Sequence, residues 1–230
     1  MIKHHPKFEL LQSFVNGDLP ASLSAGIAIH ADMCPICKEQ IAQLTEQLSY
    51  ASFEEVYLDR FIVEDASTEE ETNDIDLDIE QAIAAITESE SIDDIKPFTE
   101  KTLKFKDKTY SLPSVLNNMS LGKTANFGKL ARARVQLDEN EIHSSLLHIE
   151  PGGSVPEHTH KGFELTVLIA GSFTDEFGKY EAGDFIMLDN KHQHHPVSES
   201  GCLCFTVVND SLHFTQGINK LLNPIGSFIY

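Results

Sequence analysis

The chain has 230 residues, which suits two small domains or one large one, and its 41% hydrophobic residues can form a buried core, so wholesale disorder is excluded. No apolar run is long enough to span a membrane, and the N-terminus lacks the apolar segment of a signal peptide. We therefore expect a cytoplasmic protein. In that compartment cysteines bind metal or do redox chemistry more often than they form disulfides.

The negative charge is concentrated in the first part of the chain. The formal net charge is −19; residues 1–100 hold 5 Lys and Arg against 22 Asp and Glu, a net of −17, and residues 101–230 hold 12 against 14, a net of −2. Such an acidic region repels phosphate backbones and attracts basic proteins. We expect a protein partner for this region and no direct contact with nucleic acid.

The first sixty residues have the spacing of helices. From Phe8 to about Arg60, apolar residues recur every three or four positions, the period of an amphipathic helix. The run Gly17-Asp18-Leu19-Pro20 predicts a break between the first two helices. Pro35 is tolerated in the first turn of a helix, so a third helix should begin near Cys34.

An acidic segment follows these helices. Residues 64–94 contain 13 acidic residues and no basic one, and residues 65–73 within them resemble a loop. Isoleucines at helical spacing then predict a short helix over residues 74–88, and its apolar side is a candidate contact for a partner: Ile75, Ile79, Ile83 and Ile86. The alternative is a solvated surface helix without a partner.

After Pro97 the period of the apolar residues changes from helical to two. Residues 131–137 alternate apolar and polar side chains, as in a half-buried strand. Further short β-rich runs, separated by glycines, predict a sandwich or barrel: 144–149, 165–170, 185–188, 203–208 and 212–214. We predict an α+β protein of two domains, a helical one over residues 1–92 and a β one over residues 100–230.

The helical region contains a motif typical of a metal site. His30, Cys34 and Cys37 form the pattern H-x-x-x-C-x-x-C, and nitrogen and thiolate donors suit tetrahedral zinc. A closed site needs a fourth ligand, for which His4 and His5 are the candidates. A redox C-x-x-C pair is an alternative, although no βαβ pattern surrounds it, and two ordinary core cysteines are another.

The β region contains a second such motif. From Gly152 to Gly171 the sequence resembles the first cupin motif, G-x5-H-x-H-x3-E-x6-G, at every fixed position. His158 and His160 are two residues apart, so an extended strand points both rings to one side, and Glu164 at the start of the next strand can reach the same ion.

The second cupin motif is less complete. Counting from Gly183 places its histidine at His194, whereas Asp189, Lys191 and Ser198 depart from the motif's proline, glycine and asparagine. We expect a jelly-roll β-barrel with a divalent ion held by three histidines and a glutamate. Zinc is our first choice, with manganese, iron or nickel as alternatives that ligand spacing does not separate. The simpler alternative is a barrel with four surface polar residues and no ion.

Cys202 and Cys204 flank Leu203, so alternation places both thiols on one face of a strand. If that face lines the barrel, they could sense oxidants close to the ion. Two small core residues are an equally good interpretation, which we slightly prefer.

Both motifs and their order resemble the ChrR-type zinc-binding anti-sigma factors. The resemblance implies that His5 is the fourth zinc ligand and that the acidic helices bind an extracytoplasmic-function sigma factor. It also implies release of that factor under oxidative stress, by singlet oxygen or organic hydroperoxide, sensed by the cupin domain. Many cupins pair through their strands, so a homodimer through this domain is a further expectation.

A second hypothesis is enzymatic. Cupins with three histidines and a glutamate include metal-dependent dioxygenases and isomerases, and such an enzyme would need an open coordination position. The zinc helices and the acidic segment would then have no assigned purpose. We therefore expect a regulator rather than an enzyme.

Overall fold

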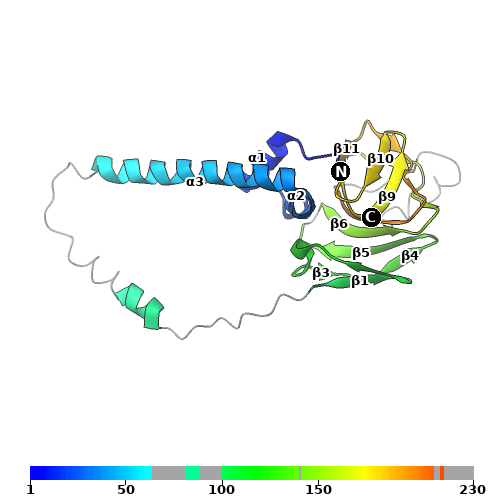
Figure 1. The fold of residues 1–230 in the computed structure, drawn as a ribbon, viewed down its shortest axis with the longest axis horizontal. Helices are drawn as coiled ribbons and strands as arrows, with labels where there is room; N and C mark the ends of the chain where they lie inside the picture. The colour runs from blue at the N-terminus through cyan, green and yellow to red at the C-terminus, as the bar shows by residue number, and fades with distance from the viewer. Residues whose placement is uncertain (64–80, 89–99, 140, 210–212, 215–230) are drawn as a thin grey trace. The chain divides into compact units, whose positions relative to one another are not determined.

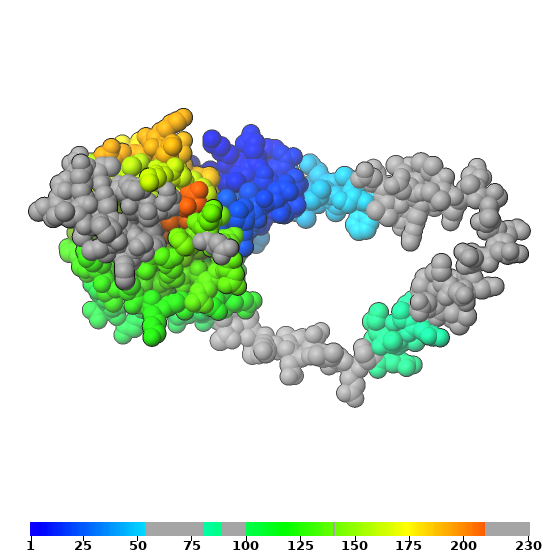
Figure 2. All heavy atoms as spheres, turned by 180° about the vertical axis from the view of Figure 1, so that it is seen from behind, coloured from blue at the N-terminus to red at the C-terminus, as the bar shows by residue number. Residues whose placement is uncertain are grey.

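The computed structural model describes residues 1–63, 81–88, 100–139, 141–209 and 213–214 (Figure 1). Within the chain, Met1–Thr45 and Glu100–Tyr230 form one compact unit, and Glu46–Thr99 forms another. In the first unit the N-terminal residues lie directly against the β-strands (Figure 2). Residues 1–45 are therefore in contact with the β region.

Three helices open the chain: α1 (Phe8–Asn16), α2 (Ala21–Met33) and α3 (Pro35–Val63). Gly17 ends α1 in the left-handed region at φ +77°, and its N–H is hydrogen-bonded to the carbonyl of Phe14. Such a conformation costs little only for glycine. The predicted break at residues 17–20 and the predicted start of the third helix beside Cys34 both match these bounds.

Helix α2 is buried on more than one side. It contacts α1 and the 3-10 turn η1 (Ser114–Leu116), and it also contacts the strands β9 (Phe163–Asp175) and β14 (Cys202–Val208). Gly26 makes this close packing feasible, since a Cβ there would lie 2.8 Å from Leu165 Cδ2. Helix α2 has apolar residues on several sides because it packs against α1 and η1 as well as against β9 and β14.

The β region is a cupin-like arrangement of antiparallel strands. The largest sheet has the order β3-β5-β6-β14-β9-β13-β7, with β4 on β5 and with β10 and β11 on β9; a smaller sheet has the order β12-β8-β15, and β1 pairs with β2 as a hairpin. The bounds of the strands not yet given are β1 Thr102–Phe105, β2 Lys108–Ser111, β3 Ser120–Leu121, β4 Ala125–Phe127, β5 Leu130–Gln136, β6 His143–Ile149, β7 Gly153–Ser154, β8 His158–Thr159, β10 Gly178–Glu181, β11 Phe185–Asp189, β12 Gln193–His194, β13 Val197–Ser198 and β15 His213–Phe214.

Alternation along the strands separates two apolar cores. On β14, Leu203, Phe205 and Val207 belong to the core that includes the helices, whereas Cys202 and Cys204 belong to the second core. The large sheet therefore has one face toward the helices and the other toward the interior of the barrel.

The predicted fold class is confirmed, since helices precede a cupin-like β domain. Several strands were not predicted, because none of them is longer than four residues and none shows a clear alternation: β1 to β4, β7, β10, β12 and β13. Residues 81–88 are helical, with Ile83 and Ile86 exposed, whereas Ile75 and Ile79 lie outside the described residues. Within the described part of the chain, no helix combines the length and the apolar character needed to cross a membrane.

Candidate metal centres

The first cluster forms where the end of α2 meets the start of α3. His30 lies in the last turn of α2, Cys34 is the residue between the two helices, and Cys37 lies in the first turn of α3. The backbone N–H of Cys34 donates to the carbonyl of His30 at 2.8 Å, the last hydrogen bond of α2, which keeps these two residues close together. His5 reaches the same place from the extended segment before α1.

Four side-chain donor atoms converge in this cluster, all within 4.8 Å of one another. His30 Nε2 lies 3.2 Å from Cys37 Sγ, and His5 Nδ1 lies 3.4 Å from the sulfur atoms of both Cys34 and Cys37. His30, Cys34 and Cys37 are buried and His5 is exposed. The ring of His4 packs against Tyr180 instead, with centroids 4.8 Å apart.

In the absence of an ion, the surroundings of this cluster disfavour the thiolate form of Cys37 and the protonated form of His30. Burial, together with the neighbouring Cys34, raises the pKa of the Cys37 thiol to about 12. Burial also lowers the pKa of His30 despite its hydrogen bond to the Gly183 carbonyl. A bound cation favours the thiolate form and so lowers the pKa of the thiols. Two sulfur and two nitrogen donors fit tetrahedral zinc.

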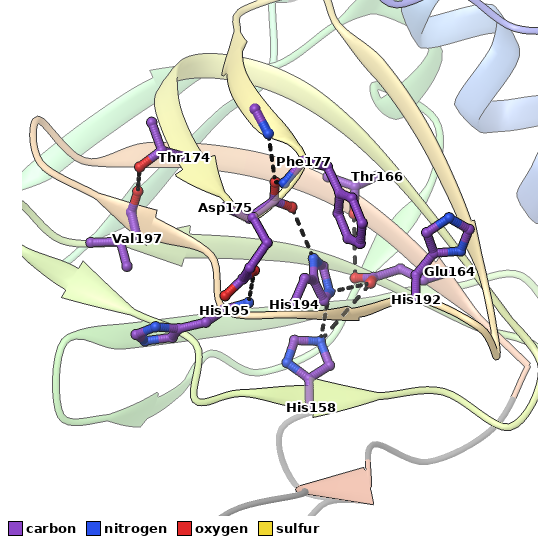
Figure 3. Close-up of polar contacts among 12 residues, drawn as sticks. His158, Glu164, Thr166, Thr174, Asp175, Phe177, His192, His194, His195 and Val197 are labelled. Carbon is purple, nitrogen blue, oxygen red and sulfur yellow. Dashed lines mark hydrogen bonds and ion pairs between the residues drawn. The ribbon is translucent and has the colours of Figure 1, made fainter.

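The second cluster lies inside the β domain, on three different strands (Figure 3). His158 is on β8, with His160 directly after it, Glu164 is the second residue of β9, and His194 ends β12. The pairing of β12 with β8 places His194 directly opposite His158. All four side chains are buried, so they depend on one another or on an ion for polar contacts.

The inward atoms of this cluster are three imidazole nitrogens and one carboxylate oxygen. Glu164 Oε2 lies 2.8 Å from His160 Nε2 and 3.2 Å from His194 Nε2. His194 Nε2 is also 3.0 Å from His158 Nε2, and two ring nitrogens this close compete for one proton. A divalent ion removes that conflict, because each Nε2 then offers a lone pair.

The outer nitrogens of His158 and His194 are held by the protein. His158 Nδ1 donates to the carbonyl of Pro156 at 2.7 Å, and His194 Nδ1 lies 3.1 Å from Asp175 Oδ2. Thr166 donates to the other oxygen of Glu164 at 3.4 Å. Such outer contacts fix the ring orientation and the tautomer that a metal needs.

The pKa values of the two facing histidines shift in opposite directions. Burial lowers the pKa of His158 to about 3. Burial opposes the charged form of His194 as well, but its hydrogen bonds to Asp175 and Glu164 outweigh burial and raise its pKa to about 9. For Glu164, contacts with His160 and His194 outweigh burial and hold its pKa well below the usual range. Without an ion, the cluster therefore holds a proton at His194.

Cys202 and Cys204 are both free and buried, with sulfur atoms 3.9 Å apart. The hydrogen bond between the two thiols and burial raise the pKa of Cys204 well above its ordinary value. Both side chains belong to the apolar core inside the barrel. The structure therefore places them as the alternation predicts, close to each other on the inner face.

Sequence reasoning missed two acidic residues beside the clusters. Asp175 binds the outer nitrogen of His194, and Asp184, in the turn between β10 and β11, binds backbone N–H groups of Lys3 and His4. Neither belongs to a motif, so only tertiary structure shows their partners. The one signal was the position of Asp184 directly after Gly183 in a predicted turn.

The fold and the two clusters define a class of protein: helices that carry a two-histidine, two-cysteine cluster, followed by a cupin domain with three histidines and a glutamate. Residues 126–211 match the protein family described as the ChrR cupin-like domain. The chain is 25% identical over 225 residues to the anti-sigma-E factor ChrR of Cereibacter sphaeroides, covering 97% of each chain.

Solved structures were compared with the fold of this chain. The crystal structure of Rhodobacter sphaeroides SigE in complex with the anti-sigma ChrR matches 90% of this chain and 99% of the solved chain, with 23% identity and a TM-score of 0.58. An RmlC-like cupin protein from Ralstonia eutropha matches 44% of this chain and 69% of its own, with 18% identity and a TM-score of 0.38. The predicted resemblance to ChrR-type anti-sigma factors is confirmed.

Proposed function

We propose that this chain is an anti-sigma factor. Its helices, within residues 1–92, sequester a cognate extracytoplasmic-function sigma factor, and its cupin domain, residues 100–230, causes release. The observation that carries the proposal is the similarity to ChrR over 97% of both chains, because it spans the helical and the β regions together. A likeness limited to the cupin domain would point to no function, since one fold serves many.

Charge and exposed apolar side chains support a protein partner. Residues 1–100 have a net charge of −17, which suits a basic partner and favours fast association. On α3, Tyr50 and Phe53 are 64% and 67% exposed, and in the segment 81–88 Ile83 and Ile86 are 56% and 74% exposed. Large apolar side chains among acidic residues are candidates for contacts that a bound sigma factor would bury.

The two clusters receive different roles in this proposal. Zinc in the cluster of His5, His30, Cys34 and Cys37 stabilises the small helical region. A divalent ion in the cluster of His158, His160, Glu164 and His194, zinc first and manganese, iron or nickel otherwise, belongs to the part that detects singlet oxygen or organic hydroperoxide. Release needs only a few kcal/mol of difference in affinity between two states of the inhibitor.

Binding is tested with purified full-length chain and the extracytoplasmic-function sigma factor of the same genome. The zinc-loaded chain should co-elute with the sigma factor on gel filtration and prevent its assembly with core RNA polymerase. A double variant, Cys34→Ser with Cys37→Ser, serves as the control and should lose both effects. A zinc-loaded, folded chain that binds no such sigma factor contradicts the proposal.

Release is tested with a substitution in the cupin domain. Truncation after residue 92 would test release less directly, because it would also expose α2, whose Gly26 packs against Leu165 and Phe205 of the β domain. The variant Glu164→Gln should still form the complex but no longer dissociate when an organic hydroperoxide or singlet oxygen is supplied. Dissociation at the wild-type rate would remove the cupin ion from the sensing mechanism.

The part played by Cys202 and Cys204 is a separate question. Their burial and their place in the apolar core support a packing role, whereas their sulfur separation of 3.9 Å supports oxidation as a pair. Thiol labelling before and after exposure to an oxidant separates the two. Thiols that stay unmodified under oxidants that release the sigma factor exclude the sensor role.

A metal-dependent cupin enzyme, such as a dioxygenase or an isomerase, is the second candidate. The observation that favours it is the second cluster itself, which is buried in the β domain and offers three nitrogens and a carboxylate. Sigma binding by the full-length chain separates the two candidates. An enzyme of this kind would bind none, while its metal-loaded form would turn over a substrate.

A further inference from the structure

The β domain contacts the first cluster through one turn, Gly183–Phe185, between β10 and β11. The carbonyl oxygen of Gly183 accepts a hydrogen bond from Nδ1 of His30 at 2.7 Å, in a buried position. Because a carbonyl only accepts, the proton must lie on Nδ1. The other nitrogen, Nε2, then offers its lone pair toward Cys37 Sγ, 3.2 Å away, as a metal requires.

The same turn holds the segment that carries His5. Asp184 is 2% exposed, and its Oδ1 accepts the backbone N–H groups of Lys3 and His4 at 2.8 and 3.1 Å. Its second oxygen accepts the N–H of Glu181 at 2.8 Å. In return, the backbone N–H of Phe185 donates to the carbonyl of His4 at 3.0 Å. His4, the residue directly before His5, is therefore tied to the β domain through both its N–H and its carbonyl.

The turn has room for this contact only because residue 183 is glycine. Its φ is +96°, and a Cβ there would lie 2.4 Å from the side chain of Ile2. The four donors of the cluster are thus held in two different ways. The cysteines lie at the start of α3 or directly before it, whereas the turn of the β domain contacts His30 directly and holds the backbone of His4 beside His5.

A single strand connects this turn to the second cluster. Strand β11 begins with Phe185 and pairs with β9, where Leu188 lies opposite Glu164. The next residue of β9, Leu165, points to the opposite face and packs on α2 at Gly26. Two short routes therefore join Glu164 to the N-terminal residues, one along β11 and one through Leu165 and α2.

We propose that the Gly183–Phe185 turn positions both histidines of the N-terminal cluster, so that retention of zinc in the helical domain depends on the cupin domain. Asp184 is a positioning residue in this device, because it acts through residues 3 and 4 and touches no donor atom itself. By linkage, zinc in the first cluster stabilises the docked turn to the same extent. The inference rests on the proposed binding of zinc by the first cluster.

The test uses the full-length chain loaded with cobalt, since only the first cluster has sulfur donors and cobalt–thiolate absorption therefore reports on it alone. Metal transfer to excess 4-(2-pyridylazo)resorcinol is followed in the wild type and in Asp184→Ala. We expect about tenfold faster loss from the variant, the usual effect of removing an outer-shell partner, and a shifted visible spectrum. Asp184→Asn keeps one acceptor oxygen and should fall between them.

The matched control is Glu181→Gln, three residues before Asp184 and with the same loss of charge. Its exposed side chain pairs with Lys179 and attracts Lys3 and the N-terminal amine through charge alone, so this variant measures the effect of losing a charge, and its rate should stay close to that of the wild type. If Asp184→Ala does not fold, Ile2→Ala loosens the contact from the N-terminal side, outside the β domain, and should also speed metal loss.

Two results overturn the proposal. Rates and spectra of folded Asp184→Ala and of Ile2→Ala equal to those of the wild type reject the coupling and leave the zinc site intact. A wild-type chain without cobalt–thiolate absorption rejects the zinc site and the coupling together.

Discussion

The two clusters share one layout, three local donors and one remote histidine, but they differ in how the remote histidine is held. In the first, three donors lie within the eight residues from His30 to Cys37, and the remote His5 is exposed and lies before the first helix. In the second, three donors lie within the seven residues from His158 to Glu164, and the remote His194 is buried and faces His158 across paired strands. A histidine on a hydrogen-bonded strand is held more firmly than an exposed one outside regular secondary structure.

The largest effect should come from removing His5, the remote donor of the first cluster. His5→Ala removes one of four donors, so zinc affinity should fall at least about a hundredfold, more than for loss of an outer-shell partner. Cobalt titration followed by thiolate absorption measures it. The control is His4→Ala, one residue earlier, whose ring packs on Tyr180 and which should stay within about threefold of the wild type. Equal losses in both variants would contradict the assignment.

The next largest effect should be a different dependence of metal affinity on pH in the two clusters. In the second cluster the metal displaces a proton from His194, whose pKa is about 9, so apparent affinity should rise about tenfold per pH unit up to about pH 9 and then level off. The first cluster must displace the Cys37 proton, with a pKa of about 12, so its rise should continue beyond pH 9. Competition with a chelator at each pH gives both curves. Parallel curves would refute the difference.

The same histidine sets the stability of the metal-free β domain. Because the folded pKa of His194 lies above the usual value of about 6.5, its protonation stabilises the fold fully below that pH. This stabilisation is lost as the pH rises through about 9. Thermal melts of chelated protein at pH 6 and pH 9.5 should show the loss, and addition of the metal should reduce it.

A smaller effect on metal affinity is expected when Asp175, which contacts the outer nitrogen of His194 in the second cluster, is substituted. Asp175→Asn weakens the contact to His194 Nδ1 at 3.1 Å, so metal affinity there should fall about tenfold while the first cluster is unaffected. Asp189→Asn is the matched control. It removes a carboxylate that also contacts a histidine, His192, but at the exposed surface. A metal affinity unchanged in Asp175→Asn would show that strand pairing alone orients His194.

The smallest change in stability should follow substitution in the helical segment 81–88. Ile86 is 74% exposed, so Ile86→Ser should change the free energy of unfolding by less than about 0.5 kcal/mol. Sigma binding should nevertheless weaken severalfold, as measured by titration of labelled sigma factor. Ala85→Ser, at a neighbouring exposed position, should leave binding unchanged. Equal binding in both variants would favour a solvated helix.

Much of the architecture follows from local patterns. The change of apolar period near Pro97 separates helices from strands, and the predicted strand over residues 131–137 corresponds to β5, Leu130–Gln136. The short strands between residues 102 and 127 escaped prediction because a strand of two to four residues shows too few alternations.

By itself, the sequence determined which atoms can bind ions: the spacing of His30, Cys34 and Cys37 fits a helix junction, and that of His158, His160 and Glu164 fits a strand and the start of the next. The resemblance already implied His5 as the fourth donor of the first cluster, whereas only the tertiary structure decided that Asp175 supports His194 and that Asp184 ties the N-terminus to the β domain. Spacing fixes geometry over a few residues, because backbone dihedral angles have few allowed combinations. Contacts between distant segments depend on how whole layers pack, which no local pattern encodes.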